Sequence, residues 1–455
     1  MTGVILALIV TVLVGFLIVK KYKPQPVLVM GGMILMLCAV GFHLGTILPA
    51  KESTGAVFFD LFEFIKKTLS TRVAGLGLSI MAVGGFARYM DQIGASKVLV
   101  QLAIKPLRKL KAPYVMLSAC FLMGQFLGLF INSASGLGML LMVTMFPVLV
   151  SLGVSRLSAT AAIATTMCLD WSPTDPGSVL SAEKAGMSIG VYWQEYQVPV
   201  ALTVMAAVAV LHYLVQRWFD RREGHKVEII APAATPADAE KLPPAWFALL
   251  PMVPLILILT FTMAIKDIKM DLVNSMLISL FVAMACEFIR SRDLNKVFAD
   301  IQVFFDGMGM QFAAVVTLVV SGEVFAQGLR SVGAIDSIIS SAQNAGFGAS
   351  GMILVMVGII AVCSVVMGSG NAPFFAFAAL APVVAAKMSI PPVLMLLPMH
   401  FGASISRAVS PITAVIVVTS GIAGVSPFDL VKRTAIPMAG ALIVNVAATF
   451  VYFYR

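Results

Sequence analysis

Apolar segments of membrane-spanning length recur along this chain and constrain its fold more than any other feature. Runs such as Thr2 to Val19 and Val27 to Leu48 hold no acidic or basic residue apart from one histidine. A helix needs about 20 such residues to cross the ~30 Å hydrocarbon core of a bilayer. Of the 455 residues, 60% are hydrophobic and only 12% are charged, which is more apolar surface than one water-soluble core hides. The sequence therefore predicts an all-α polytopic membrane protein with membrane lipid among its partners.

Hydropathy predicts ten transmembrane helices. They lie near residues 2–19, 27–49, 72–90, 157–185, 196–215, 245–265, 271–289, 306–327, 391–423 and 437–454. Two further apolar stretches, 112–152 and 349–386, are each split by a cluster of Gly, Ser and Asn. We interpret both as re-entrant hairpins. A full pair of crossings is the alternative, because it also returns the chain to its starting face.

Basic residues indicate which face of the predicted protein is cytoplasmic. Most of the 31 Lys and Arg residues fall in loops on one side, and short basic loops are typical of the cytoplasmic face. These loops hold Lys20, Lys21, Lys23, the segment 88–111, Arg156, the segment 217–241, the segment 290–296, Lys432 and Arg433. Topology thus explains the net charge of +9, and no nucleic-acid partner is expected. The five cysteines show no CxxC pairing, so no metal site is predicted.

The two halves of the chain carry the same pattern of residues. The clearest match is a Pro-Gly-Pro series that repeats at an offset of 238 residues: Pro173, Gly186 and Pro199, then Pro411, Gly424 and Pro437. A second block, 86–95, matches 325–334 at an offset of 239. Ordered blocks at a nearly constant offset indicate an internal repeat.

The two copies are predicted to have inverted topology. Loop 97–111 carries five basic residues and its counterpart 336–351 carries none, so the two loops are expected on opposite faces. Inverted repeats with broken helices near the midplane are typical of secondary transporters. The predicted organisation is N-terminal scaffold helices in 1–71, inverted repeat 1 in 72–215, a cytoplasmic linker in 216–244, scaffold helices in 245–305 and inverted repeat 2 in 306–455.

Each predicted hairpin is interrupted by small and polar residues that suit an anion site. The substrate-contact candidates are Asn132, Ser133, Ala134, Ser135 and Gly136 in the first hairpin and Ser369, Gly370 and Asn371 in the second. Small residues permit tight turns, and free amides at a helix start direct partial positive charge at a ligand. The alternative is that these clusters are close-packing motifs, which membrane helices also use.

A second interruption follows each hairpin, within 170–177 and within 404–411. The matched prolines, Pro173 and Pro411, each remove a helix hydrogen bond, so an unwound segment is expected twice. The remaining substrate-contact candidates lie in or beside these segments: Ser172, Pro173, Thr174, Ser410, Pro411 and Thr413.

Arg407 is flanked by long apolar runs, and a charge placed there normally lines a polar cavity. Its guanidinium suits a bidentate pair with a substrate carboxylate. The alternative is a structural ion pair with Asp170 or Asp175. These two aspartates and His400 are candidates for a coupling ion or proton, and H+ and Na+ both stay open. No cofactor is predicted.

Several segments resemble one transporter family. NSASGLGMLLMVTMFP, MGSGNAPFFAF, SRAVSPITAVIVVTSGIAGVSPF and VKRTAIPMA are similar to the C/D branch of the anaerobic C4-dicarboxylate (Dcu) carriers, within the wider ion transporter superfamily. The resemblance covers essentially the whole chain. It implies transport of succinate, fumarate and malate across the bacterial cell inner membrane. It also implies an elevator mechanism, in which 112–215 and 349–455 move against a homodimeric scaffold of 1–111 and 245–348.

These observations together predict a secondary active transporter of C4-dicarboxylates, working by exchange, efflux or cation-coupled symport. Its midplane site is expected to be formed by the two hairpin tips and the two unwound breaks. The alternative is a cation/proton antiporter of similar fold that uses Asp170 and Asp175 as ligands. An enzyme is not expected, because the sequence has no P-loop, HExxH or GxSxG motif.

Overall fold

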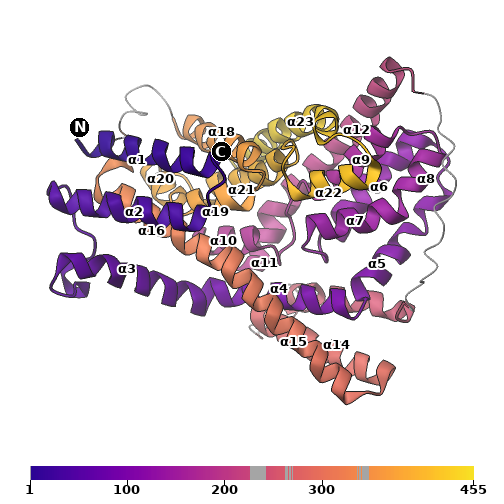
Figure 1. Cartoon of the computed structure of the whole chain (residues 1–455), viewed down its shortest axis with the longest axis horizontal. Coiled ribbons are helices and arrows are strands. Elements are labelled where there is room, and N and C mark those ends of the chain that lie inside the picture. Colours follow the sequence, from indigo (N-terminus) through magenta and orange to yellow (C-terminus); the bar gives the residue numbers. More distant parts are fainter. Residues whose placement is uncertain are drawn as a thin grey trace.

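The computed structural model describes residues 2–225, 242–261, 270–335 and 348–454, with isolated positions at 265, 268, 337 and 340. Within these residues every regular element is a helix (Figure 1). Seven helical segments are long and apolar enough to cross a membrane: Pro24–Gly41, Val57–Gln92, Ile189–Arg222, Leu272–Ser291, Leu294–Ser331, Ala349–Met367 and Pro427–Phe453. The predicted all-α membrane protein is therefore confirmed at this level.

The first half begins with two helices, continues with a long helix that contains a π-helical turn, and then has several short helices before a long final helix. In order, they are α1 (Thr2–Val19), α2 (Pro24–Gly41), α3 (Val57–Arg72), the π-helix η2 (Val73–Gly77), α4 (Leu78–Gln92), α5 (Ala95–Ile104), α6 (Pro113–Leu127), α7 (Ala134–Thr144), α8 (Phe146–Ser151), α9 (Arg156–Ala164), α10 (Pro176–Lys184), α11 (Ile189–Val191), the π-helix η4 (Tyr192–Gln197) and α12 (Val198–Arg222). Short 3-10 turns, η1 (Ala50–Glu52) and η3 (Leu107–Lys109), lie in the connections.

The second half follows a similar order. Its elements are the 3-10 helix η5 (Ala245–Met252), α13 (Val253–Leu259), α14 (Leu272–Ser291), α15 (Leu294–Gln311), the π-helix η7 (Phe312–Val316), α16 (Thr317–Ser331), α18 (Ala349–Met367), α19 (Asn371–Ala378), α20 (Ala381–Lys387), α21 (Val393–Arg407), α22 (Ala414–Ala423) and α23 (Pro427–Phe453).

Unusual backbone features recur at the offsets found in the sequence. The π-helix η7 lies 239 residues after η2. Gly94 and Gly333, also 239 residues apart, both have left-handed φ angles, of 77° and 69°. Gly186 and Gly424, 238 residues apart, do so as well, at 71° and 67°. Two segments of similar sequence thus share their rarest local conformations.

Several helix boundaries differ from those predicted. The span predicted at 72–90 is part of a continuous helix from Val57 to Gln92, because Arg72 is accommodated within that helix by ion pairs with Glu183 and Glu323. The span predicted at 306–327 begins at Leu294, where the Asp293 side chain accepts the amide N–H of Lys296 and caps the helix.

Each of the two predicted interruptions, 170–177 and 404–411, contains a non-helical segment, but Pro176 and Gly177 lie in α10 and residues 404–407 lie in α21. α9 ends at Ala164 and α10 begins at Pro176, while α21 ends at Arg407 and α22 begins at Ala414. The predicted linker 216–244 starts within α12, which continues to Arg222, and its residues 226–241 lie outside the described part of the chain. Most of loop 336–351 lies outside it too.

Glycines allow the long helices to pack closely. A Cβ at Gly32 of α2 would lie 2.5 Å from the carbonyl oxygen of Val324 in α16, and one at Gly328 would lie 2.7 Å from that of Gly32. The second long helix pair, α4 and α15, is equally close, since a Cβ at Gly307 would lie 2.9 Å from the carbonyl oxygen of Gly84. Small residues at such crossings are typical of membrane helices.

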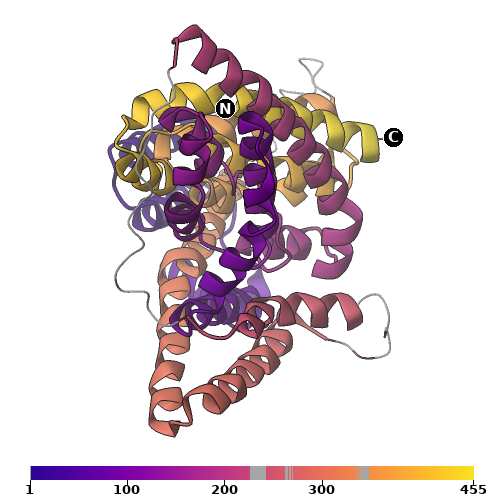
Figure 2. The ribbon, with the colours of Figure 1, turned by 90° about the vertical axis from the view of Figure 1, so that its right-hand side faces the viewer.

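Long helices lie on two sides of a central region of broken helices. In Figure 1, α3, α4, α14 and α15 run below, while α12, α18 and α23 run above, with α10, α19 and α21 between them. Figure 2 shows α14 and the first part of α15 projecting below the other helices. The broken helices therefore meet near the middle of the fold, against a wall of continuous ones.

Candidate functional site

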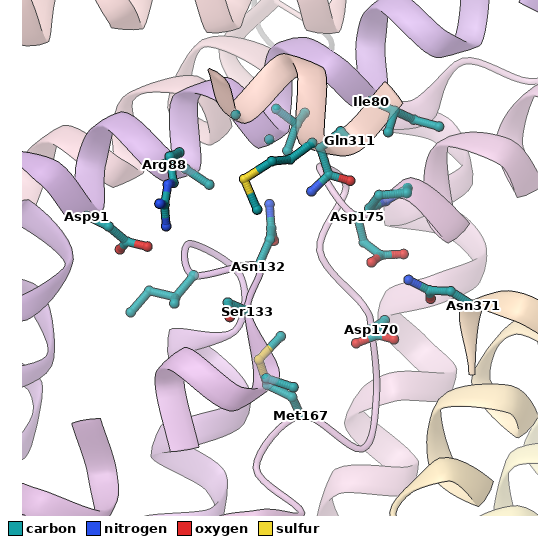
Figure 3. A pocket seen from close by; sticks show the side chains of 18 of the residues that line it. Ile80, Arg88, Asp91, Asn132, Ser133, Met167, Asp170, Asp175, Gln311 and Asn371 are labelled. Carbon is teal, nitrogen blue, oxygen red and sulfur yellow. The ribbon is translucent and has the colours of Figure 1, made fainter. Parts of the chain in front are cut away.

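A cavity of about 240 Å³ lies where the broken helices face α4 and α15 (Figure 3). It is lined by Ile80, Val83, Gly84, Ala87, Arg88, Asp91, Ser96, Phe130, Ile131, Asn132, Ser133, Ala134, Met167, Asp170, Asp175, Pro176, Gly307, Met310, Gln311, Asn371 and Arg407. Both halves of the chain contribute. Seven of the predicted site residues are among them: Asn132, Ser133, Ala134, Asp170, Asp175, Asn371 and Arg407.

The turn between α6 and α7 brings the first hairpin tip into the cavity. Ser133 is the N-cap of α7, and its Oγ accepts the N–H of Gly136 at 3.1 Å. Asn132 precedes it and donates from Nδ2 to Oγ1 of Thr174 at 3.0 Å. Ser135 and Gly136 lie in the first turn of α7 and do not line the cavity. The tip thus faces the cavity with the capped start of α7, and only part of the polar cluster 132–136 lines the cavity.

The first break is fastened to this hairpin by hydroxyl groups. Ser172 donates to the carbonyl oxygen of Leu129 at 2.9 Å, and its Oγ lies 2.7 Å from that of Thr174. Both serine and threonine are buried. With Pro173 between them, they hold the unwound segment in place but do not line the cavity. Their polar atoms satisfy the loop itself, as buried polar groups must.

Arg407 and Asp170 form an ion pair between the two breaks. An Arg407 guanidinium nitrogen donates to Oδ1 of Asp170 at 2.7 Å and to the carbonyl oxygen of Met167 at 2.9 Å. Oδ2 of Asp170 accepts from the hydroxyl of Ser404 at 2.7 Å. Both oxygens of Asp170 therefore have partners. The structure places Arg407 at the cavity and, at the same time, in the structural ion pair that the sequence left as the alternative.

Asp175 and His400 meet next to this pair. Asp175 is the N-cap of α10, where its Oδ2 accepts the N–H groups of Gly177 at 2.7 Å and Ser178 at 3.1 Å. Nε2 of His400 lies 3.1 Å from the same oxygen. Side-chain ligand atoms of Asp170, Asp175 and His400 lie within 4.8 Å of one another. The three candidates for a coupling ion or proton are thus brought together.

His400 is held between aromatic rings. Its ring centroid lies 4.9 Å from that of Phe374 and 5.7 Å from that of Phe401. The side chain is 2% exposed, and its Nδ1 has no hydrogen-bond partner among the described residues. The imidazole does not line the cavity and contacts it only through Asp175.

The second hairpin tip reaches the cavity through Asn371. α18 ends at Met367, and Gly368 follows with a left-handed φ of 66°. Ser369 Oγ accepts the N–H of Ala372 at 3.4 Å. A Cβ at Gly370 would lie 2.9 Å from the carbonyl oxygen of Ala403, so glycine lets this tip pack against α21. Ser369 and Gly370 do not line the cavity.

The part of the second break that follows Arg407 does not reach the cavity. Thr413 donates to the carbonyl oxygen of Arg407 at 2.6 Å, which closes the loop behind the arginine. Ser410 is fully buried, and its Oγ has no partner among the described residues. Ser410, Pro411 and Thr413 are all absent from the cavity wall. The first break supplies two aspartates that line the cavity. The second contributes only Arg407, the last residue of α21.

The wall formed by α4 and α15 was not predicted as part of the site. It contributes Arg88 and Asp91, both exposed, and the side chain of Gln311. Gln311 Oε1 is buried and has no partner among the described residues. A signal did exist in the sequence: Gly84 and Gly307 are helix glycines, and close backbone approach at such positions brings one helix against another.

Comparison with known proteins connects this architecture to a transporter family. The C4-dicarboxylate anaerobic carrier (DcuC) family matches residues 2–454. A protein of Vibrio cholerae named as a probable anaerobic C4-dicarboxylate transporter DcuC is 36% identical over 454 residues, covering 99% of this chain and 98% of the relative. The anaerobic C4-dicarboxylate transporter DcuC of Escherichia coli K12 is 34% identical over 447 residues, covering 98% and 95%.

Two solved structures share the fold at low sequence identity. The YdaH transporter of Alcanivorax borkumensis aligns with a TM-score of 0.66 at 15% identity, covering 95% of this chain and 98% of that one. MtrF of Neisseria gonorrhoeae aligns with a TM-score of 0.60 at 11% identity, covering 95% of each chain. The protein is a transporter of the bacterial inner membrane and not an enzyme. The chain belongs to the DcuC family of C4-dicarboxylate anaerobic carriers.

Proposed function

We propose that the chain is a secondary active transporter of C4-dicarboxylates such as succinate, fumarate and malate, and that the central cavity binds the substrate. One observation carries this proposal: α7 and α19, from the two halves, both start at a cavity that also contains the guanidinium groups of Arg88 and Arg407. Helix starts and guanidinium groups both favour carboxylates. A ligand with a carboxylate at each end suits two such half-sites.

The names of the relatives support the same substrate class. The proteins of Vibrio cholerae and Escherichia coli that match nearly the whole chain are named as anaerobic C4-dicarboxylate transporters. A cavity of about 240 Å³ is large enough for a four-carbon diacid.

The charges around the cavity favour transport coupled to a cation. Its ionisable lining consists of two arginines and three aspartates, a balance of one negative charge when all five are ionised. A dicarboxylate adds two more negative charges in a partly buried space, where unpaired charge is unfavourable. Entry of H+ or Na+ with the substrate reduces this cost. Asp175, beside His400, is the group we assign to that role.

We propose alternating access by an elevator motion of inverted repeats. The recurrence of π-helices and left-handed glycines at constant offset supports two copies of one unit. The broken helices, within 112–215 and 349–455, would move against scaffold helices in 1–111 and 245–348, with two copies of the chain joined through the scaffold. Such an arrangement exposes one midplane site to each face in turn.

A cation/proton antiporter is the second candidate. The cluster of Asp170, Asp175 and His400 is the observation that favours it, since carboxylates and imidazole bind protons. The ion pair between Asp170 and Arg407 weighs against it, because a guanidinium within the cluster repels a second cation.

Counterflow in proteoliposomes tests the proposal. Vesicles containing the purified protein are loaded with succinate, and the entry of labelled succinate, fumarate, malate, citrate and aspartate is measured with and without imposed H+ or Na+ gradients. We expect the C4-dicarboxylates to exchange and citrate to be excluded. Transport of cations without movement of any dicarboxylate, under every gradient, would establish the antiporter and overturn the proposal.

A further inference from the structure

We propose that the chain has a specific site for an anionic phospholipid, behind the second hairpin tip. A second cavity of about 270 Å³ lies between α1, α2 and α16 on one side and α18 and α19 on the other. Its wall is almost wholly apolar and includes Val14, Ile18, Phe325, Met367 and Phe377. This cavity is separate from the central one, because the two share no lining residue.

The shape and surroundings of this cavity suit a hydrocarbon chain. Its lining runs along α1 from Thr11 to Ile18, a length of about 10 Å at ~1.5 Å per residue. Val362 and Val366, which also line it, are 64% and 41% exposed. In a membrane-spanning helix, exposed apolar side chains face lipid, so the cavity opens to the bilayer and an acyl chain can enter from the side.

Three lysines lie at one end of the cavity. Ile18 and Pro24 line it, and between them in the sequence are Lys20, Lys21 and Lys23, all exposed. None of the three lysines pairs with an acidic side chain in the described part of the chain. Clustered lysines next to the end of a transmembrane helix attract anionic lipid headgroups.

The charge and aromatic content of this connection point to an anionic headgroup in particular. Tyr22, within the lysine cluster, is 59% exposed, as is usual for aromatic side chains at the membrane–water interface. Lys21 has a left-handed φ of 67°, so the connection turns tightly at the cavity. Lys20 lies over the ring of Phe16, 5.1 Å from its centroid. An apolar slot ending at cations that have no acidic partner among the described residues matches the two parts of a phosphatidylglycerol or cardiolipin molecule better than it matches a zwitterionic lipid.

A lipid in this cavity would contact the back of the second hairpin tip. Met367, Ala372 and Pro373 line the lipid cavity, whereas their neighbour Asn371 lines the central cavity. One short segment therefore separates the two sites.

Native mass spectrometry of the purified full-length protein tests the site directly. The probes are phosphatidylglycerol and phosphatidylcholine with identical acyl chains. We expect preferential retention of phosphatidylglycerol, reduced roughly tenfold or more by the triple substitution Lys20→Gln, Lys21→Gln and Lys23→Gln. The matched charge control is Lys105→Gln, Lys109→Gln and Lys111→Gln, in another basic loop, which should leave retention unchanged.

A pair of glycine substitutions tests the acyl slot. A Cβ at Gly15, which lines the cavity, meets no atom within 4 Å, and the same is true of Gly358, which does not line it. Gly15→Phe should fill the slot and abolish preferential retention, while Gly358→Phe should not. Equal retention of the two lipids by the unmodified protein overturns the proposal, as does an equal effect of the two phenylalanines.

A third result would identify a different occupant. If Gly15→Phe dissociates a dimer but leaves lipid retention unchanged, a second copy of the chain covers this face and the lipid site does not exist. Lipid retention is measured without substrate, so its outcome is independent of whether the chain carries dicarboxylates.

Discussion

Arg407 combines a structural ion pair with the substrate contact that we propose for it. It donates to Asp170 and to the carbonyl oxygen of Met167, and it still lines the cavity. A guanidinium has more donors than these contacts use, so one face can hold the two breaks together while another meets a substrate carboxylate. Its loss therefore affects both stability and transport, and the two effects can be separated.

Arg407→Ala should destabilise the protein by about 3–5 kcal/mol, because it leaves Asp170 buried without its partner. The double variant Asp170→Asn with Arg407→Ala should recover much of this loss, since the remaining amide is neutral. Thermal unfolding in detergent measures both. Succinate counterflow should be absent from both variants. If counterflow in the folded double variant equals that of the unmodified protein, Arg407 does not bind substrate.

The variant Asp175→Asn distinguishes coupling to a cation gradient from binding of the substrate. The asparagine side-chain oxygen can still cap α10, but it cannot carry the charge that faces His400. We expect succinate counterflow to continue while accumulation driven by an H+ or Na+ gradient is lost. The exposed Asp429, which pairs with Lys432, is the control: Asp429→Asn should change neither measurement. Full gradient-driven accumulation by Asp175→Asn would remove this residue from the coupling step.

At the scale of elements, α10 connects the site to the long helices. Its N-cap, Asp175, faces His400, and near its other end Lys184 pairs with Glu323 of α16 at 2.5 Å. Glu323 also accepts from Arg72 of α3 at 2.8 Å. Helix α10 thus carries Asp175 at the cavity. About two turns further along, it carries Lys184, which joins an ion-pair cluster on the proposed scaffold.

Glu323→Gln should lower the free energy of unfolding by about 3 kcal/mol, because Arg72 and Lys184 are then left largely buried without this acid. The coupling energy with Lys184→Gln, from a double-mutant cycle of thermal unfolding, should be large. The matched cycle on the exposed pair Asp429 and Lys432 should give about 0.5 kcal/mol or less. Equal coupling in the two cycles would mean that the Glu323 cluster adds no more stability than an exposed ion pair.

The left-handed glycines offer a second test at this scale. Gly186 has a φ of 71° and open space around its Cβ position, so Gly186→Ala adds backbone strain without a clash. We expect a loss of about 1 kcal/mol. Gly421 lies within α22, also with open space, and Gly421→Ala should stabilise by about 0.5–1 kcal/mol. A stabilising Gly186→Ala would show that the left-handed conformation is not retained in the membrane.

The interruptions could be predicted because their cause is local. Proline next to small polar residues disfavours a helix through local effects, which is why the regions around Pro173 and Pro411 were identified. Proline alone is not sufficient, since Pro398 and Pro437 lie inside α21 and α23. The long helices could not be delimited in this way. Arg72 stays within a helix because its partner Glu323 lies 251 residues further along the chain, and charge compensation over that distance leaves no local signature.

The same difference between local and long-range causes explains which residues of the cavity could be predicted. Asn132 and Asn371 were predicted because each lies in a recognisable break. Arg88 and Gln311 were missed because they sit on continuous helices, where only packing decides which face meets the cavity. Ser172, Thr174 and Thr413 were predicted to contact substrate, but their hydroxyls instead fasten the loops. Their contact with substrate remains a prediction for another state of the transport cycle.

For the whole molecule, the cavity identifies the face from which substrate has access. Arg88 and Asp91 line it and are exposed, and Arg88 begins the basic segment 88–111. Basic loops are typical of the cytoplasmic side, so we infer that this structure is open to the cytoplasm. The cluster of Arg72, Lys184 and Glu323 then lies on the opposite side.

Cysteine labelling tests this orientation. In a background without the five natural cysteines, Ser133→Cys should react with a membrane-impermeant thiol reagent added from the cytoplasmic face, and succinate should slow the reaction. Lys66→Cys, on a side chain that is 69% exposed, should react only from the periplasmic face. Reaction of both cysteines from the same face would invalidate the assigned topology.

The charge balance around the cavity also determines how the membrane voltage acts on transport. With no substrate, the ionisable lining carries one negative charge, and a bound dianion raises this to three unless cations enter with it. Moving one charge through 100 mV changes the free energy by about 2.3 kcal/mol. A carrier that takes up two protons with each dianion moves the same charge loaded or empty, so its net uptake does not depend on the membrane voltage. A carrier that takes up three cations becomes electrogenic, so the stoichiometry at Asp175 and its neighbours decides whether the cell's electrical potential can drive accumulation.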